Sequence, residues 1–170
     1  MTSWTPPRIA LICLLLLGCS TTAIAADGWD MSLTGGFVAS GLTDPVYALG
    51  TVSNRPTRVV VRETAQESSA ALGVAMFAEI FHDRVKWLAP LAVGLGLRSD
   101  GRAQVYMGSA LRLGTHASVA TGVAIGPVAT LPPGLSEGSS VADTNQLTNL
   151  ATRTRASWFV GVTYTFATLK

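Results

Sequence analysis

Residues 102–128, RAQVYMGSALRLGTHASVATGVAIGPV, decide the fold because apolar residues recur at every second position in two successive runs. In both runs, 102–114 and 116–128, the odd positions are mostly apolar and the even positions mostly small or polar. Gly114, the last residue of the first run, and Thr115 join the two runs. A period of two over runs of this length predicts β-strands rather than helices, because successive side chains of a strand point to opposite faces.

Four further segments alternate in the same way, the first of them more weakly: 30–42, 69–82, 88–98 and 156–167. Six strands of this length are long for a soluble sheet but suit tilted strands that cross a membrane, which need about 9–11 residues. Two weaker segments, 46–52 and 57–64, either form a hairpin that raises the count to eight strands or form an extension beyond the membrane.

The two faces of these strands differ in the surroundings they suit. The chain is 48% hydrophobic and only 13% charged, and the faces opposite the apolar ones are dominated by Gly, Ala and Ser. A soluble sandwich, which would turn the apolar faces inward, would be left with a poor water-facing surface. We therefore predict an all-β, antiparallel, up-and-down transmembrane β-barrel of six to eight strands within residues 26–170.

Six strands alone would leave two open edges, which lipid does not tolerate. We therefore expect either segment 46–64 or neighbouring chains to complete the ring.

The first 25 residues are typical of a cleaved signal peptide. Arg8 supplies positive charge, residues 9–17 form a short apolar core, and Ala23-Ile24-Ala25 suits a leader peptidase. An alternative is lipoprotein processing, in which residues 16–19 act as a lipobox and Cys19 is lipidated. The two cysteines, Cys13 and Cys19, both lie in this segment, so a plain signal would leave the exported chain without thiols.

The connections and the aromatic residues predict which way the barrel faces. If the chain starts on the periplasmic side, 82–87 and 114–115 are short periplasmic turns, and 129–155 is a long extracellular loop rich in Pro, Gly, Ser and Thr. Aromatic side chains then fall at both membrane interfaces. The inner set is Trp29, Trp87, Tyr164 and Phe166, and the outer residue is Trp158.

The inward faces carry a few charges. Glu79 and Arg112 are expected one step above the inner turns, either as a lumenal pair with His116 nearby or as separate solvated side chains. The lining arginines Arg58, Arg62, Arg98 and Arg102 are expected toward the outer mouth, so a channel here would prefer anions. The small inward residues favour a closed, packed interior over an open pore.

Two serines lie in sequence contexts that can suit a catalytic nucleophile. Residues 134–138 match the G-x-S-x-G pattern around Ser136, but they lie in a polar loop with no helix after it. The set Ser118, His116 and Glu79 is expected in the lumen near the periplasmic end, whereas outer-membrane lipid A deacylases need such a set on the lipid side. We predict no catalytic residues.

Metal and nucleic-acid binding find little support. His82, Asp83 and His116 are too few for a metal site, so we predict neither metal nor cofactor. The net charge is +2 and no basic run occurs, so nucleic acid is not an expected partner.

The carboxy-terminal strand carries a resemblance. Residues 157–166, SWFVGVTYTF, resemble the signal read by the outer-membrane assembly machinery, in which hydrophobic residues alternate and end in an aromatic; four residues follow Phe166 here. Over residues 30–167 the chain resembles small bacterial outer-membrane β-barrel proteins, including porin-like and uncharacterised envelope proteins. The resemblance implies location in the outer membrane of a Gram-negative bacterium, with outer-membrane lipid and the assembly machinery as partners.

Three functions remain open on this basis. The leading one is a non-enzymatic structural or surface-interaction role, with loop 129–155 as the contact surface. The second is a small porin-like, anion-preferring channel, formed by one chain or by a homo-oligomer. The third is a membrane-embedded lipid-modifying hydrolase.

Overall fold

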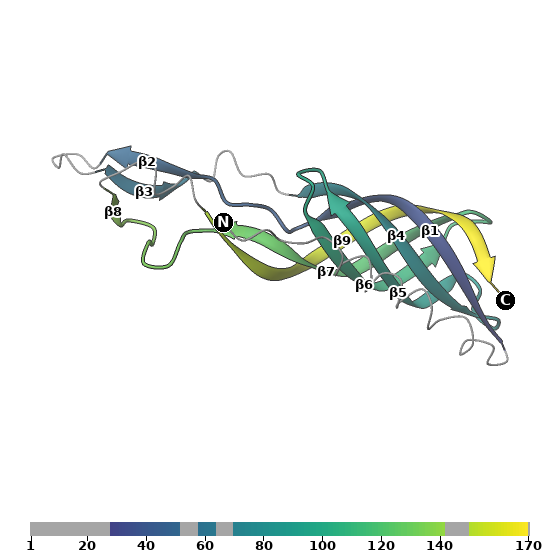
Figure 1. The fold of residues 1–170 in the computed structure, drawn as a ribbon. Coiled ribbons are helices and arrows are strands. Elements are labelled where there is room, and N and C mark those ends of the chain that lie inside the picture. The colour runs from purple at the N-terminus through teal and green to yellow at the C-terminus, as the bar shows by residue number, and fades with distance from the viewer. Residues whose placement is uncertain (1–27, 52–57, 64–69, 142–149, 170) are drawn as a thin grey trace, which may run out of the picture.

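The computed structural model of the protein describes residues 28–51, 58–63, 70–141 and 150–169. The predicted signal peptide, residues 1–25 with Cys19, lies outside them. In the described part the chain is all-β, and every paired strand is antiparallel to its neighbours. The strands form a closed ring of six and a separate three-stranded sheet (Figure 1).

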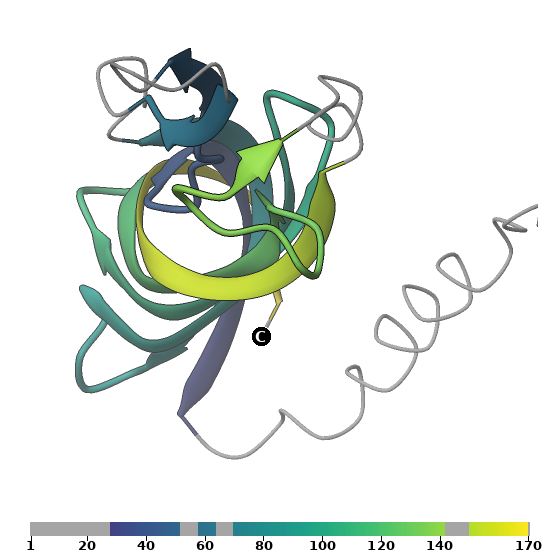
Figure 2. The ribbon, with the colours of Figure 1, turned by 90° about the vertical axis from the view of Figure 1, so that its left-hand side faces the viewer.

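The ring follows the chain in up-and-down order, β1-β4-β5-β6-β7-β9. Figure 2 shows the ring from one end. Its strands are β1 (Trp29–Ser40), β4 (Ala71–His82), β5 (Leu88–Arg98), β6 (Ala103–Arg112), β7 (Ala117–Thr130) and β9 (Ala151–Leu169). The predicted antiparallel up-and-down sheet is thus confirmed, with six strands in the ring.

The ring closes within one chain, so both expected ways of completing it are wrong. β9 pairs with β7 along one edge and with β1 along the other, from Ser40 opposite Phe159 to Met31 opposite Leu169. Neither segment 46–64 nor a neighbouring chain is needed, because β1 and β9 satisfy each other's edges.

Segment 46–64 contributes to the separate sheet instead. β2 (Tyr47–Thr51) and β3 (Arg58–Arg62) pair as a hairpin, and β8 (Ser140–Val141) adds to β3. This small sheet lies beyond one end of the ring and gives the molecule its elongated shape (Figure 1). Of the two alternatives for these segments, the structure therefore has the extension rather than two further ring strands.

The predicted loop 129–155 is shorter than expected. β7 runs to Thr130 and β9 begins at Ala151, and the two strands stay paired as far as Thr130 opposite Ala151. The pairing of β6 with β7 extends no further toward the end of β7 than Val105 opposite Ile125. Beyond this point the last residues of β7 and the first residues of β9 pair only with each other and continue past the ring as a two-stranded ribbon.

A β-bulge in β5 corrects one predicted face. Ala89 lies opposite Ala110 and Ala92 lies opposite Gly108, so β5 has one extra residue at this point. A strict alternation over 88–98 puts Ala89 outward with Leu91 and Pro90 inward with Ala92, but Ala89 is fully buried and Pro90 is exposed. Proline has no N–H to donate to the ladder, and a bulge is where a strand accommodates it.

The connections define two ends of the ring. Residues 83–87 and 113–116 connect β4 to β5 and β6 to β7 at the end where β1 starts and β9 finishes, here named the short-turn end. At the opposite, long-loop end, two connections are long and include the small sheet, whereas the β5–β6 turn spans only 99–102. Gly101 and Gly114 have φ of 82° and 112°, which suits glycine at these tight turns.

Candidate functional site

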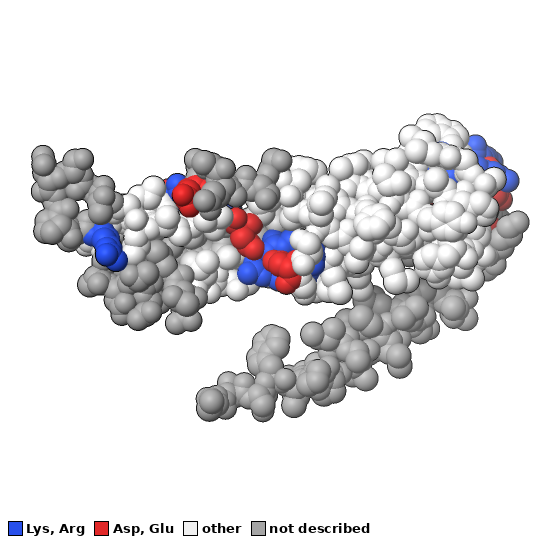
Figure 3. All heavy atoms as spheres, turned by 90° about the horizontal axis from the view of Figure 1, so that it is seen from above, with Lys and Arg blue, Asp and Glu red and all other residues white. Residues whose placement is uncertain are grey.

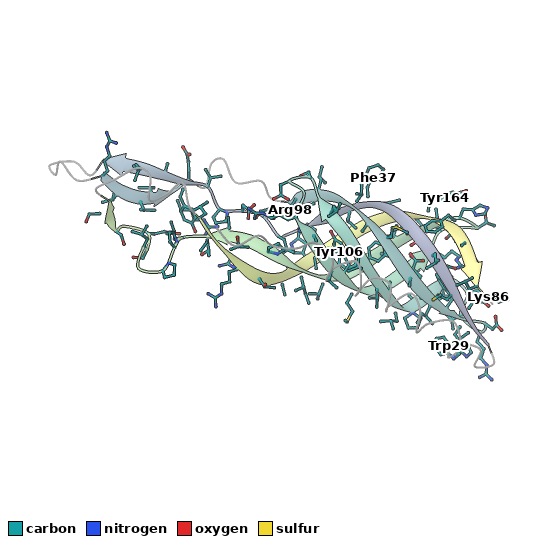
Figure 4. The ribbon with its side chains drawn as sticks, in the orientation of Figure 1. Trp29, Phe37, Lys86, Arg98, Tyr106 and Tyr164 are labelled. Atoms are coloured by element: carbon teal, nitrogen blue, oxygen red, sulfur yellow. The ribbon has the colours of Figure 1, made fainter. Side chains whose placement is uncertain are left out.

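The outer surface of the ring carries a continuous apolar belt contributed by all six strands. Phe37 is 77% exposed, and Met76 and Val162 are each 61% exposed. Phe37 projects from the ring in Figure 4, whereas Tyr106 lies inside it. The apolar belt consists of Phe37, Leu72, Val74, Met76, Leu91, Val93, Leu95, Leu97, Val105, Met107, Leu111, Val123, Ile125, Trp158, Val160, Val162, Tyr164 and Phe166.

Charged side chains avoid this belt. Those of the ring strands are Asp30, Glu79, Arg98, Arg112, Arg153 and Arg155. Glu79 and Arg98 are buried inside the ring, and the last two lie on the ribbon beyond it. Figure 3 shows the result: charge gathers at the two ends of the ring, with an uncharged surface between them.

The aromatic residues singled out in the sequence lie toward the two ends of the belt. Trp29 starts β1, Trp87 is in the turn before β5, and Tyr164 and Phe166 lie in the last part of β9, all toward the short-turn end. Trp158 lies toward the long-loop end, where its carbonyl accepts a hydrogen bond from the Gly41 N–H. Trp29, Tyr164 and Lys86 are seen toward one end of the ring and Arg98 toward the other in Figure 4.

The interior of the ring is filled by aromatic side chains. Phe77, Tyr106 and Phe159 pack together with ring centroids 5.0 to 5.7 Å apart, and all three are almost fully buried. Small residues make room for them: a Cβ on Gly94 would lie 2.5 Å from the Phe77 ring. The small inward residues predicted from the sequence therefore coexist with bulky aromatic ones inside the ring.

Glu79 is fully buried on the short-turn side of this aromatic group, and its carboxylate accepts hydrogen bonds from two hydroxyls. The Thr34 hydroxyl donates to Glu79 Oε1 at 2.8 Å and the Thr163 hydroxyl donates to the same oxygen at 3.1 Å. Arg112 lies nearer the short-turn end, where its guanidinium carbon is 3.8 Å from the centroid of the Phe81 ring and Nη2 donates to Ser32 Oγ at 2.8 Å. No ion pair joins Glu79 to Arg112 among the described residues.

His116 does not join these groups. It is exposed in the turn before β7 and stacks on Tyr164, with centroids 5.5 Å apart. Ser118, two residues on, is fully buried inside the ring. The structure therefore does not bring His116, Ser118 and Glu79 together as an acid–base set.

A cluster of four charged residues closes the long-loop end of the ring. Arg98 and Arg102 both pair with Asp44, which lies in the connection after β1, and with Asp100 in the β5–β6 turn. The Ala129 N–H also donates to Asp44 Oδ1 at 2.6 Å. The Arg98 side chain is buried, and its hydrogen bond lowers the pKa of Asp100 to about 2. This group is named the mouth cluster.

Sequence reasoning placed Arg98 and Arg102 at this mouth but missed both of their acidic partners. Asp44 precedes Pro45 in a segment with no periodic pattern, so nothing in the sequence tied it to a turn more than fifty residues away. Arg58 and Arg62, which the sequence had placed with the lining arginines, instead begin and end β3 in the small sheet.

Between the ring and the small sheet lies a pocket of about 360 Å³. Leu42 and Tyr47 line it from the connection after β1 and from β2, and Arg155 and Ser157 line it from β9. Arg62 and Glu137 contribute charges of opposite sign.

The remaining candidate residues are dispersed. Ser136 lies in an exposed loop, where its hydroxyl and that of Ser139 are 2.9 Å apart. His82 packs edge-on against Trp29 at 4.7 Å between centroids, and its Nδ1 accepts from the Arg84 N–H. Within the described residues, no three His, Cys, Asp or Glu side chains are grouped so as to hold a metal ion.

Comparisons with known proteins find no relative. No protein-family model matches the chain, and neither a curated protein nor a solved structure matches it. The class of protein is thus defined by the fold alone, an all-β chain built around a closed ring of six antiparallel strands. No helix in the described part of the chain is both long enough and apolar enough to cross a membrane.

Proposed function

We propose that the protein is a non-enzymatic outer-membrane β-barrel with a structural or surface-interaction role, exported by a cleaved signal peptide. The observation that carries the proposal is the apolar belt, which surrounds a closed ring and is interrupted by no charged side chain. Soluble monomers rarely expose a contiguous apolar patch of more than a few hundred Å². Lipid is the surrounding that this surface suits.

The backbone of the ring supports the same conclusion. Only helices and closed barrels satisfy their own backbone hydrogen bonds in hydrocarbon, and the β1–β9 pairing leaves the ring without an edge. The six strands have 10 to 19 residues, enough for the roughly 9–11 that a tilted membrane strand requires. Charged turns and aromatic side chains at the ends of the belt fit the two interfaces of a bilayer.

The interior argues against the channel alternative. The stacked Phe77 and Phe159, with Tyr106 edge-on to Phe159, occupy the centre of the ring, and the mouth cluster lies across its long-loop end. A hydrolase finds equally little support, because Ser118 is buried inside the ring whereas His116 is exposed in a turn, and Ser136 lies in an exposed loop.

The contact surface in this proposal is the extension beyond the ring rather than a loop spanning 129–155. It comprises the small sheet, the β7–β9 ribbon and the pocket of about 360 Å³ between them and the ring. With the ring in the outer membrane and the short turns on the periplasmic side, this extension stands on the cell surface.

Heat-modifiability on a gel, combined with density fractionation of the cell envelope, tests the proposal. We expect the protein in outer-membrane fractions, with an unboiled band near monomer size that shifts on boiling. Val93→Arg places a cation in the belt, which at the bilayer midplane costs about 2–4 kcal/mol and should abolish the shift.

Val61→Arg is the matched control, because Val61 is 43% exposed on the small sheet and Val93 is 39% exposed on the belt. The control should shift like the unmodified protein. A soluble periplasmic product with no shift would overturn the proposal.

A further inference from the structure

Five side chains from five strands form a polar ring inside the barrel. Ser32 on β1 lies opposite Glu79 on β4, and Ser118 on β7 lies opposite both Arg112 on β6 and Thr163 on β9. Hydrogen bonds link the pair Ser32 and Glu79 to the other three residues, because Thr163 donates to Glu79 and Arg112 donates to Ser32. Ser32, Glu79 and Ser118 are fully buried, and Thr163 is nearly so.

The polar ring contains hydrogen-bonding atoms that find no protein partner. They are Glu79 Oε2, Ser118 Oγ and Arg112 Nε, and Thr165 Oγ1 lies next to this level on β9. A buried polar atom left without a partner costs about 1–3 kcal/mol, and more for a charged group. The three unpartnered atoms of the polar ring, with Thr165 Oγ1 beside them, are therefore expected to share a polar occupant.

Aromatic groups enclose this level on both sides. Glu79 alternates on β4 with Phe77 and Phe81, which point into the same interior, so one aromatic ring lies on either side of it along the strand. Phe77 stacks with Phe159 toward the long-loop end, and the Arg112 guanidinium covers Phe81 toward the short-turn end. An occupant of the polar ring would be held away from bulk solvent.

The charges of the ring decide what the occupant is. One carboxylate and one guanidinium balance each other, so neither a cation nor an anion is needed to neutralise the site. The unpartnered atoms include an acceptor, Glu79 Oε2, a donor, Arg112 Nε, and a hydroxyl that can do either, Ser118 Oγ. Buried water typically makes about three hydrogen bonds to groups of this mixed kind.

We propose that the polar ring binds ordered water that joins the Glu79 carboxylate to the Arg112 guanidinium, so that the two charges form a water-bridged pair across the interior. The bridge couples β4 to β6, which are not neighbours in the ring. The inference rests on the interior contacts alone and would hold whatever surrounds the apolar belt.

A double-mutant cycle tests the coupling. Glu79→Gln and Arg112→Met, measured by urea unfolding of the folded protein in detergent micelles, should each lower the midpoint by roughly 1 M. Together they should lower it by clearly less than the sum, because each single change leaves the other charge without its bridge. Glu79→Gln combined with Arg98→Met is the control, since Arg98 lies beyond the aromatic side chains, and it should be additive. Additivity in both cycles would overturn the proposal.

Water itself is detected by relaxation dispersion of the solvent ¹⁷O and ²H signals. The unmodified protein should hold at least one long-lived internal water that a Glu79→Leu/Arg112→Met double variant lacks. Equal signals from the two proteins would contradict the proposal even if the charge variants proved too unstable for the cycle.

Discussion

Asp44 and Arg102 are joined by a two-pronged ion pair, in which Arg102 Nη1 lies 2.8 Å from one carboxylate oxygen of Asp44 and 2.9 Å from the other. The pair connects the segment that follows β1 to the last residue of the β5–β6 turn. Arg98 and the Ala129 N–H bind the same carboxylate, so Asp44 fixes three parts of the chain at the long-loop end of the ring.

Replacing Asp44 should therefore loosen the connection to the small sheet while leaving the ring closed. Asp44→Ala leaves the buried Arg98 with fewer partners, and we expect a loss of about 2 kcal/mol in unfolding free energy. Hydrogen exchange should speed up in residues 41–46 and at Ala129. Asp83→Ala is the control, because its pair with Lys86 is exposed and spans 3.9 Å, and it should change little. Equal effects of the two variants would contradict this role of Asp44.

Asp100 should make the mouth cluster resistant to acid. The hydrogen bond from Arg98 lowers the pKa of Asp100 to about 2, from an ordinary value of 3.8. A lowered carboxyl pKa contributes stability that is present above the ordinary value and is lost as the pH falls through the lowered one. The contribution of Asp100 should thus be complete above about pH 4 and disappear toward pH 2.

Carbon-detected NMR titration of the Asp100 carboxyl measures this directly. An Asp100→Asn variant should lose the pH dependence of stability in that interval. A midpoint near 3.8 in the unmodified protein would show that Arg98 does not hold the carboxylate.

Glycine should be required at position 108, where the backbone of β7 leaves no room for a side chain. A Cβ at Gly108 would lie 2.0 Å from the Thr121 carbonyl oxygen, which is a backbone atom that cannot turn aside. Gly108→Ala should destabilise the ring by about 3 kcal/mol and weaken the heat-dependent gel shift. Ser109→Ala, the next residue, is the matched control and should behave like the unmodified protein. Normal behaviour of Gly108→Ala would mean that the strands are less tightly apposed there.

The filled interior should block ion flow. We expect no steady conductance from the purified protein in planar lipid bilayers, because Phe77, Tyr106 and Phe159 occupy the centre of the ring. Gly108→Ala, which should fold poorly, is the control. Steady single-channel currents that this variant also gives would come from a contaminant. Currents that only the folded protein gives would favour the channel alternative.

The alternation of apolar and small residues was enough to predict the six long strands, their antiparallel order and the outward direction of side chains such as Met107 and Val162. The alternation of side chains along a strand depends only on neighbouring residues, so it can be recognised directly in the sequence. The alternation is weaker in segments 46–52 and 57–64, and the strands in these segments belong to a sheet outside the ring.

Features that depend on contacts between distant residues could not be predicted in this way. Closure needs β9 to pair with both β7 and β1, which no local pattern encodes. The bulge at Pro90 reversed the side on which Ala89 lies, although the proline itself was a signal that could have been used. Glu79 and Arg112 were correctly placed on the inward face, but partners such as Thr34 and Ser32 could not be identified without the register.

The central claim is that the apolar belt faces lipid, and site-directed spin labelling tests it most directly. Both cysteines of the chain lie in the proposed signal peptide, so single variants Val93→Cys, Val162→Cys and Val61→Cys of the protein without that segment can each carry one nitroxide after reconstitution into liposomes. The account predicts that the two belt positions are relaxed strongly by oxygen, which concentrates in the bilayer, and weakly by a water-soluble nickel chelate, with the reverse at position 61. Strong relaxation by the nickel chelate at all three positions would contradict it.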